Sequence, residues 1–341
     1  MSSKQDRDPR GLSSRRLIAL AAAAAVLVLA IAGFLIWKQN QDQQDQDVSA
    51  GHQVNVGSGI QHITYRGRQY AYNNRITSIL LIGIDSDGVM SPLKRYTIAP
   101  RADSISLLVL DETHGKMTII ALSRDTMTQI RRYTMNGRDR GLFVDHLGYA
   151  YTYGDGWDVS CRNVCEAVSN LFYGVPIGDY VVMNRSSLPL LAKALGALEV
   201  TVPNDDLKEL GFAKGQTVMI DETNLETFVR SRDTQQDLSN EGRMERQQAY
   251  INAAAGVIRY KAENEPSALW DTVLEAESCV HTNITHSRYL NLIKILKNTA
   301  YDTGNYYVPE GRQVIAEDHD EFYPDEETLL KQIISIFFLE K

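Results

Sequence analysis

The chain has 341 residues, of which 43% are hydrophobic, and its formal net charge is −8. This length supplies enough apolar material for one large domain, and the three cysteines are too few for a disulfide framework. Residues 1–38 carry a net charge of +4, so the remainder carries −12. Such an acidic body disfavours nucleic acid as its ligand, because nucleic-acid-binding proteins present a broad basic face.

Residues 17–37 form an uncharged apolar run, LIALAAAAAVLVLAIAGFLIW. As a helix rising about 1.5 Å per residue, this run can cross the roughly 30 Å hydrocarbon core of a bilayer. Five basic residues precede it: Lys4, Arg7, Arg10, Arg15 and Arg16. Because basic flanks stay in the cytoplasm, the sequence predicts a single-pass cell-membrane protein with a cytoplasmic tail (residues 1–16) and an extracytoplasmic body. A cleaved signal peptide is the alternative, but the run exceeds the usual apolar length and no small-residue cleavage site follows Trp37 directly.

Residues 38–76 are rich in Gln, Asp, Asn and Gly, which predicts a polar stalk. The fold proper is expected to begin near Thr77, with strands over residues 78–84, 104–110 and 116–122. Five residues join the second strand to the third, so these two strands are expected to pair as an antiparallel hairpin.

The hairpin places the start of the second strand beside the end of the third, and therefore Asp103 near Arg124. If the first strand runs parallel to the third, Asp85 ends at the same edge of the sheet. Asp85, Arg101, Asp103, Arg124 and Asp125 then converge. This convergence depends on the orientation of the first strand.

Helices and short strands alternate over the rest of the chain. Helices are predicted over residues 164–172, 186–195, 222–230, 243–260, 267–280 and 286–298 and from about Asp325, and strands over residues 176–183 and 198–202. Asp221 is the expected cap of the 222–230 helix. The alternation predicts an α/β domain over residues 77–260, completed by a helical part over residues 261–341.

Arginine recurs where such a fold exposes its site-forming loops. Besides Arg101 and Arg124, the sequence has Arg230 and Arg232 in an Arg-x-Arg pair, and Arg243, Arg246 and Gln247 at helical spacing. The last three are expected to face one ligand near a helix N-terminus, where the dipole also favours an anion. A single Arg-x-Arg pair is more often a solvated face, but the joint pattern predicts a heavily anionic ligand such as a diphosphate.

Carboxylates beside these arginines suggest a divalent cation. Asp85 and Asp103 are candidate ligands of Mg²⁺, or of Mn²⁺, although Asp85 could equally cap a turn. A tyrosine-rich stretch, residues 149–156, is predicted to be a rim loop that either stacks on sugar or packs internally. Cys161 and Cys165 lie one helical turn apart, as small core residues do, and one bridge to Cys279 stays open. The sequence has no HExxH, GxSxG or Walker A motif, which removes support for zinc-protease, α/β-hydrolase and P-loop functions.

Taken in order, eight segments resemble the LytR-CpsA-Psr family of bacterial envelope proteins. They are Leu80–Asp85, Arg101–Ile105, Leu122–Thr126, Ala150–Gly154, Gly174–Ile177 with Tyr180, Leu195–Pro203, Val229–Arg232, and Gly242–Gln248. The segment Asp145–Tyr149 and a polar insertion over residues 233–241 depart from the family pattern, which leaves the acceptor open.

The resemblance implies an α/β/α sandwich with a central mixed sheet and an apolar tunnel for a polyprenyl chain. It implies transfer of a teichoic-acid-like or capsular glycan from polyprenyl diphosphate to peptidoglycan. Matched by motif, Asp85 and Asp103 would hold Mg²⁺, and the diphosphate clamp would consist of Arg101, Arg124, Arg230, Arg232, Arg243 and Gln247. Arg124 would be catalytic, and either Asp103 or Asp125 would accept the proton of the attacking hydroxyl. Two other functions would use the same residues: a non-catalytic receptor that regulates envelope synthesis, and a diphosphate hydrolase.

Overall fold

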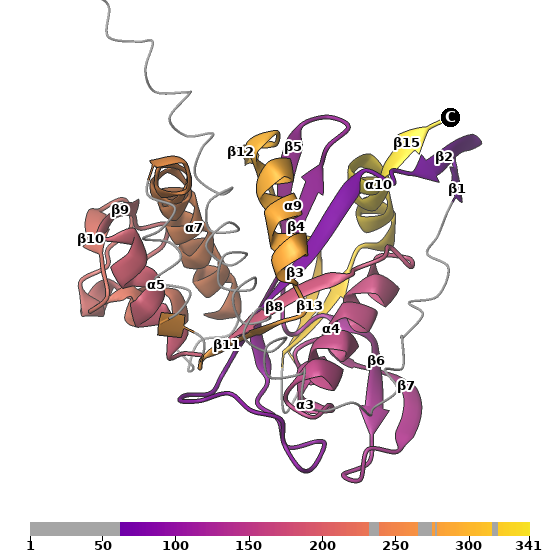
Figure 1. Cartoon of the computed structure of the whole chain (residues 1–341), viewed down its shortest axis with the longest axis horizontal. Coiled ribbons are helices and arrows are strands. Elements are labelled where there is room, and N and C mark those ends of the chain that lie inside the picture. The colour runs from indigo at the N-terminus through magenta and orange to yellow at the C-terminus, as the bar shows by residue number, and fades with distance from the viewer. Residues whose placement is uncertain (1–61, 232–238, 265–274, 277, 316–319) are drawn as a thin grey trace, which may run out of the picture.

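The computed structural model describes residues 62–231, 239–264, 275–276, 278–315 and 320–341. Its centre is a six-stranded sheet in the order β11-β8-β3-β4-β5-β12 (Figure 1). The strands are β3 (Ile76–Ile84), β4 (Ala102–Asp111), β5 (Lys116–Leu122), β8 (Asp179–Met183), β11 (Val280–Thr282) and β12 (Ala300–Tyr307). The three strands predicted first in the sequence are thus confirmed as neighbours in this sheet.

Strand directions bring the predicted loops to one edge. β4 is antiparallel to both β3 and β5, so β3 and β5 run in the same direction, as the predicted convergence required. Gly83 pairs with Ser104, and Ile105 pairs with Leu122. The end of β3, the start of β4 and the end of β5 therefore lie side by side. Parallel pairing of β3 with β8 and of β5 with β12 makes the sheet mixed.

Alternation along the strands divides the core into two layers. Leu108 and Leu110 belong to one buried cluster, while Leu107 and Val109 belong to the other, because successive side chains of a strand point to opposite faces. The first cluster is covered by α5 (Ser187–Leu195), α6 (Leu225–Arg230), α7 (Ser239–Asn264) and α9 (His286–Lys297), and the second by α4 (Asp158–Leu171) and α10 (Glu326–Phe337). Figure 1 shows helices on both sides of the sheet, as the predicted sandwich requires.

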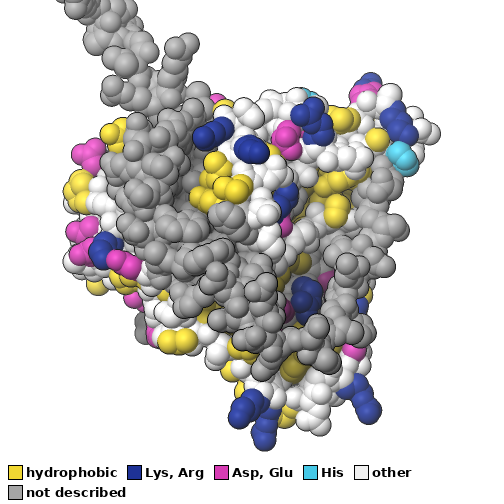
Figure 2. All heavy atoms as spheres, viewed as in Figure 1, with side chains coloured by type: hydrophobic (Ala, Val, Ile, Leu, Met, Phe, Trp, Pro, Cys, Tyr) yellow, Lys and Arg dark blue, Asp and Glu magenta, His cyan; other side chains and the backbone are white. Residues whose placement is uncertain are grey.

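Smaller units extend this framework. They are the hairpin of β6 (Met127–Tyr133) and β7 (Asp139–His146), α3 (Tyr149–Thr152), the pair β9 (Leu198–Thr201) and β10 (Thr217–Ile220), η2 (Lys208–Leu210), and the pair β13 (Gly311–Val314) and β14 (Glu321–Pro324). Figure 2 shows Lys and Arg side chains at the lower end of the face in view, where Figure 1 shows the loop between β3 and β4 and the tip of the β6–β7 hairpin.

The folded domain begins earlier than Thr77. β1 (His62–Tyr65) and β2 (Arg68–Tyr72) form a three-stranded sheet with the C-terminal β15 (Phe338–Glu340). The predicted stalk is therefore wrong over its last residues. Ile63 and Tyr65 pack against the core, and so do Tyr70 and Tyr72, because apolar side chains alternate along an otherwise polar sequence.

The predicted helical part, residues 261–341, is also only partly right. It supplies two strands of the central sheet, β11 and β12, as well as β13 to β15. The helices near residue 290 and after Asp325 are confirmed, and the Asp325 side chain accepts the Thr328 N–H as an N-cap. Most of the helix predicted over residues 267–280 lies outside the described residues, and Val280 begins a strand instead.

Three further expectations concern the cap of α6, the pairing of the cysteines and the membrane helix. α6 begins after Asn224 rather than at the predicted Asp221 cap, and the Asp221 carboxylate instead accepts the N–H of Thr223 in the preceding turn. Cys161, Cys165 and Cys279 are buried free thiols. The predicted membrane helix at residues 17–37 lies outside the described residues, and within the described residues no helix is long and apolar enough to cross a membrane.

Candidate functional site

Asp103 lies at the centre of a charged cluster where β3, β4 and β5 meet. Its carboxylate accepts a hydrogen bond from Arg124 and lies 3.3 Å from the Nε of Arg101. The Arg124 side chain is only 6% exposed, and its Nε lies 3.4 Å from the carboxylate of Asp125. The structure therefore brings together four of the residues that the sequence predicted to converge.

Gly148 allows the loop after β7 to pack directly against these arginines. A Cβ atom at this position would lie 2.7 Å from the carbonyl oxygen of Ala102 and 3.2 Å from side-chain carbons of Arg101 and Arg124. The Gly148 N–H donates to Arg124 O at 2.8 Å, and Gly148 O accepts from Ala102 N at 3.1 Å. Any side chain here would push the two arginine-bearing segments apart. The sequence analysis did not identify Gly148, because only this tertiary packing gives it a role.

The tyrosine-rich stretch is only partly the predicted loop, since residues 153–156 form a turn but the residues before them are helical. Tyr149–Thr152 form the short helix α3, and Tyr151 is fully buried with its hydroxyl donating to Gly156 O. Tyr149 lies under Arg101, with 5.7 Å between the guanidinium carbon and the ring centre. Tyr151 therefore packs internally, and the ring of Tyr149 helps to orient the guanidinium of Arg101.

The pKa of Asp103 reflects opposing influences. Burial of the carboxyl raises its pKa. The charges of Arg124, Arg243 and Arg101 and the hydrogen bond from Arg124 lower the pKa by more than burial raises it. The resulting pKa is below the ordinary value of 3.8. Asp103 is therefore ionised at neutral pH and is a weak proton acceptor.

This lowered pKa predicts a pH-dependent contribution to stability. A carboxyl whose pKa is lower in the folded state stabilises the fold above its unfolded pKa, and this contribution is lost as pH falls through the folded value. The unfolding free energy of wild type is expected to exceed that of Asp103→Asn most above pH 3.8, with the gap narrowing below it. Urea unfolding at a series of pH values measures this gap, with exposed Glu209→Gln as control. A gap that is constant across the series would contradict the prediction.

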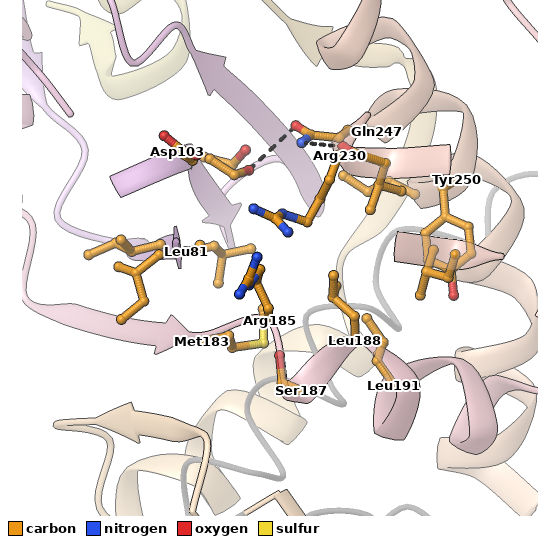
Figure 3. Close-up of a pocket in the computed structure, with 18 of the residues that line it drawn as sticks. Leu81, Asp103, Met183, Arg185, Ser187, Leu188, Leu191, Arg230, Gln247 and Tyr250 are labelled. Atoms are coloured by element: carbon orange, nitrogen blue, oxygen red, sulfur yellow. Dashed lines mark hydrogen bonds between the residues drawn. The ribbon is translucent and has the colours of Figure 1, made fainter. Parts of the chain in front are cut away.

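A cavity of about 210 Å³ opens beside Asp103, between the sheet and helices α5, α6 and α7. Arg243 donates from Nη2 to the backbone oxygen of Asp103 at 3.0 Å. Gln247 donates to Val229 O at 3.1 Å and accepts from the Ser104 hydroxyl at 3.4 Å (Figure 3). Arg230 binds Asp85 at 2.6 Å and Glu226 at 2.7 Å. The polar end of the cavity thus combines residues from β3, β4, α6 and α7.

The body of the cavity is apolar. Its wall includes Leu81, Leu108, Ile119, Met183, Leu188, Leu191, Leu195, Leu225, Val229, Tyr250, Ile251 and Tyr306. Figure 3 shows the leucines of α5 and Tyr250 of α7 on the side of the cavity away from Asp103. The site therefore suits an amphiphile, a ligand whose anionic head meets the arginines and whose apolar chain lies against the leucines.

Two of the predicted arginines differ from the rest. Arg246 is completely buried and points away from the cavity; it donates to the backbone oxygens of Phe228 and Ser231 and to the side chains of Asn204 and Asp206. The expectation that it faces the ligand is wrong, because the orientation of α7 turns this position toward α6 and the loop that follows β9. Arg232 lies outside the described residues.

Arg185 was missed by the sequence analysis. It lies two residues beyond the end of β8, lines the cavity, and binds the carboxylate of Asp87. β8 runs parallel to β3, so residues that follow both strands emerge at the same edge of the sheet. That topological signal could have identified Arg185 had the pairing of β8 with β3 been foreseen.

The carboxylates fit a magnesium ion. Asp85 and Asp103 both line the cavity, and the Asp85 side chain is 48% exposed. Within the described part of the chain, no three His, Cys, Asp or Glu side chains form a metal-binding group. Mg²⁺, and Mn²⁺ with similar ligand preferences, commonly takes only one or two carboxylates and completes its shell with substrate phosphate oxygens and water. The carboxylates of Asp85 and Asp103, beside the arginines of the cavity, form a donor set of this kind.

Comparison with known proteins identifies related sequences and folds. Residues 34–329 match the LytR_cpsA_psr family. A Bacillus cereus protein named polyisoprenyl-teichoic acid–peptidoglycan teichoic acid transferase TagU is 29% identical over 238 residues, 68% of each chain. The crystal structure of B. subtilis TagV aligns with a TM-score of 0.56 at 21% identity, over 77% of this chain and 96% of that one. Protein gbs0355 from Streptococcus agalactiae aligns with a TM-score of 0.58 at 19% identity, over 77% and 86% of the two chains.

Proposed function

The chain belongs to the LytR_cpsA_psr family, and on that premise we propose that it is a transferase that moves a teichoic-acid-like or capsular glycan from polyprenyl diphosphate to peptidoglycan. The observation that carries the proposal is the cavity with arginines and aspartates at one end and leucines along its body. A polyprenyl diphosphate has the matching chemistry, an anionic head on an apolar chain. The name of the Bacillus cereus relative, a teichoic acid transferase, supports the same donor and acceptor classes.

Phosphoryl transfer depends on positioning and charge neutralisation more than on a protein nucleophile. An acceptor hydroxyl would attack the glycan-side phosphorus, forming a new P–O bond as the bond from that phosphorus to the bridging oxygen breaks. Arg124, with Arg101 beside it, would stabilise charge on the transferred phosphoryl group, and Arg230, Arg243 and Gln247 would orient the diphosphate. Arg232 is proposed for this clamp from its place in the sequence motif alone.

Asp103 and Asp125 were both candidate bases. The lowered pKa of Asp103 and its contact with Arg124 make it a poor proton acceptor. We assign Asp103 an electrostatic role and keep Asp125 as the candidate base. A loose transition state, in which the hydroxyl proton is lost late, demands little from either group.

We further propose that Asp85 and Asp103 hold Mg²⁺, or Mn²⁺, when the donor is bound. The ion would neutralise phosphate charge. Arg230 would hold Asp85 in place, since it contacts that carboxylate at 2.6 Å. Residues 17–37 are proposed to anchor the domain outside the cell membrane, next to a donor whose lipid resides there, with residues 1–16 in the cytoplasm.

Incorporation of label into the cell wall tests the proposed function. Full-length protein in detergent is incubated with a radiolabelled polyprenyl-diphosphate glycan, insoluble peptidoglycan and Mg²⁺. Wild type is expected to move label into the insoluble fraction, EDTA to suppress this, added Mg²⁺ to restore it, and Asp103→Asn to abolish most of it. Tight donor binding without incorporation would instead indicate a receptor, and soluble labelled glycan phosphate a hydrolase.

A further inference from the structure

Arg185 is part of the cavity wall, yet it belongs to none of the segments that resemble the family. It lies between β8 and α5, and its side chain is 34% exposed. Figure 3 shows the guanidinium groups of Arg185 and Arg230 pointing toward each other inside the cavity. Within the described residues, the arginines on the cavity wall are Arg185, Arg230 and Arg243.

A shared anion accounts for the approach of these two cations. One carboxylate oxygen of Asp85 lies 2.6 Å from Nη2 of Arg230 and 3.8 Å from Nη1 of Arg185. Two guanidinium groups that converge repel each other unless a negative group lies between them. Asp85 occupies that position here, and a phosphate group bound beside it would offer both guanidinium groups further negative charge and acceptor oxygens.

The Arg185 side chain is held in place before any ligand binds. Its Nε donates to Asp87 at 2.8 Å, and Nη2 contacts the other oxygen of the same carboxylate. The surrounding loops are joined by three more hydrogen bonds: Arg185 N to Ser86 O, Asn184 Nδ2 to Gly88 O, and Gly88 N to the Ser186 hydroxyl. A guanidinium fixed in this way loses little conformational entropy when it binds an anion.

The neighbours of Arg185 identify which phosphate it would meet. Met183 precedes it on β8 and Leu188 follows it on α5, and both line the apolar body of the cavity. Arg124 and Arg101 instead contact Asp103 on the β4–β5 side of the site. The phosphate next to the leucines is the one that carries the lipid.

We propose that Arg185, positioned by Asp87, binds the lipid-side phosphate of the donor and stabilises it as the leaving group. This inference rests on the proposed transferase function. When the bond between the glycan-side phosphorus and the bridging oxygen breaks, the electron pair and the bridging oxygen stay with the lipid phosphate. That group gains negative charge beside Arg185, where a fixed cation stabilises it.

Binding of two lipid probes tests the assignment. Full-length protein in detergent is titrated with a fluorescent polyprenyl monophosphate and with the corresponding polyprenol, which has the same chain but no phosphate. Arg185→Gln is expected to weaken monophosphate binding by about tenfold to a hundredfold, because a charge-assisted contact is lost. Polyprenol binding stays unchanged, and Arg185→Lys restores part of the loss. Arg131→Gln is the matched control, since Arg131 is 26% exposed and also contacts two carboxylates, Asp139 and Glu166.

The outcomes separate this inference from the proposed function. If wild type prefers the monophosphate and Arg185→Gln keeps that preference, Arg185 has no role at the lipid phosphate. Equal loss of both probes would mean that the substitution damages the cavity, which also overturns the assignment. If wild type binds the monophosphate no better than polyprenol, the polyprenyl-diphosphate donor itself is wrong.

Discussion

Arg124→Ala is expected to lower the rate of glycan transfer by about a hundredfold to a thousandfold, the usual cost of removing one fixed donor that stabilises transition-state charge. Arg124 is 6% exposed and lies between the carboxylates of Asp103 and Asp125. Its loss removes the cation nearest to Asp103 and leaves two aspartates facing each other without their shared partner. The rate of label incorporation at saturating donor measures the effect.

Stability has to be measured alongside the rate, because removing one member of a buried ion pair costs about 3–5 kcal/mol. Arg124→Lys is informative, since it keeps the charge but loses the planar fork that contacts two carboxylates, and it should recover only part of the rate. Arg131→Ala supplies the control, because it removes another paired arginine from the domain. A folded Arg124→Ala protein that transfers glycan at the wild-type rate would exclude Arg124 from the chemistry.

The charged edge of the sheet could be predicted because its signals are local. Apolar runs locate β3, β4 and β5, and the short connection between β4 and β5 requires an antiparallel hairpin. Once β3 also pairs antiparallel with β4, Asp103 and Arg124 must be neighbours. Only the direction of β3 had to be assumed.

Other features depend on contacts between distant parts of the chain. β12 joins β5 and β15 joins β2 across long sequence separations, so neither strand could be placed from its own residues. Arg185 reaches the cavity because β8 pairs with β3, and Gly148 matters because Ala102 O lies against it. Side-chain type identified the chemistry of the site, whereas sheet order determined which side chains share it.

Helical spacing has a related limit. Positions three and four residues apart on α7 share one side of the helix, which grouped Arg243, Arg246 and Gln247. The spacing does not show which residues on that side face the cavity and which pack against neighbouring elements. Arg243 and Gln247 line the cavity, while Arg246 is buried against α6 and the loop that follows β9. The same periodicity therefore yields two ligand-facing residues and one structural residue.

Arg246→Met is accordingly expected to destabilise the domain by about 3–5 kcal/mol. Methionine keeps much of the side-chain volume but leaves Phe228 O, Ser231 O and the Asp206 carboxylate without the guanidinium. Burial lowers the pKa of Arg246 and the charges of Asp206 and Glu245 raise it, with a net lowering that shows how strongly the site desolvates the cation. Thermal unfolding should show a melting temperature lower by roughly 10 °C, given about 2–4 °C per kcal/mol for domains of similar size.

The same substitution separates structural support from ligand contact. Arg246 holds α6 against α7 through the backbone oxygen of Phe228, and α6 ends at Arg230, so its loss loosens the clamp without removing a ligand contact. Well below the melting temperature, Arg246→Met should transfer glycan within about tenfold of wild type, because the lost contacts are remote from the reacting atoms. Arg131→Met should leave the melting temperature nearly unchanged, since partly exposed ion pairs contribute little. An unchanged melting temperature with complete loss of transfer would mean instead that Arg246 binds the ligand.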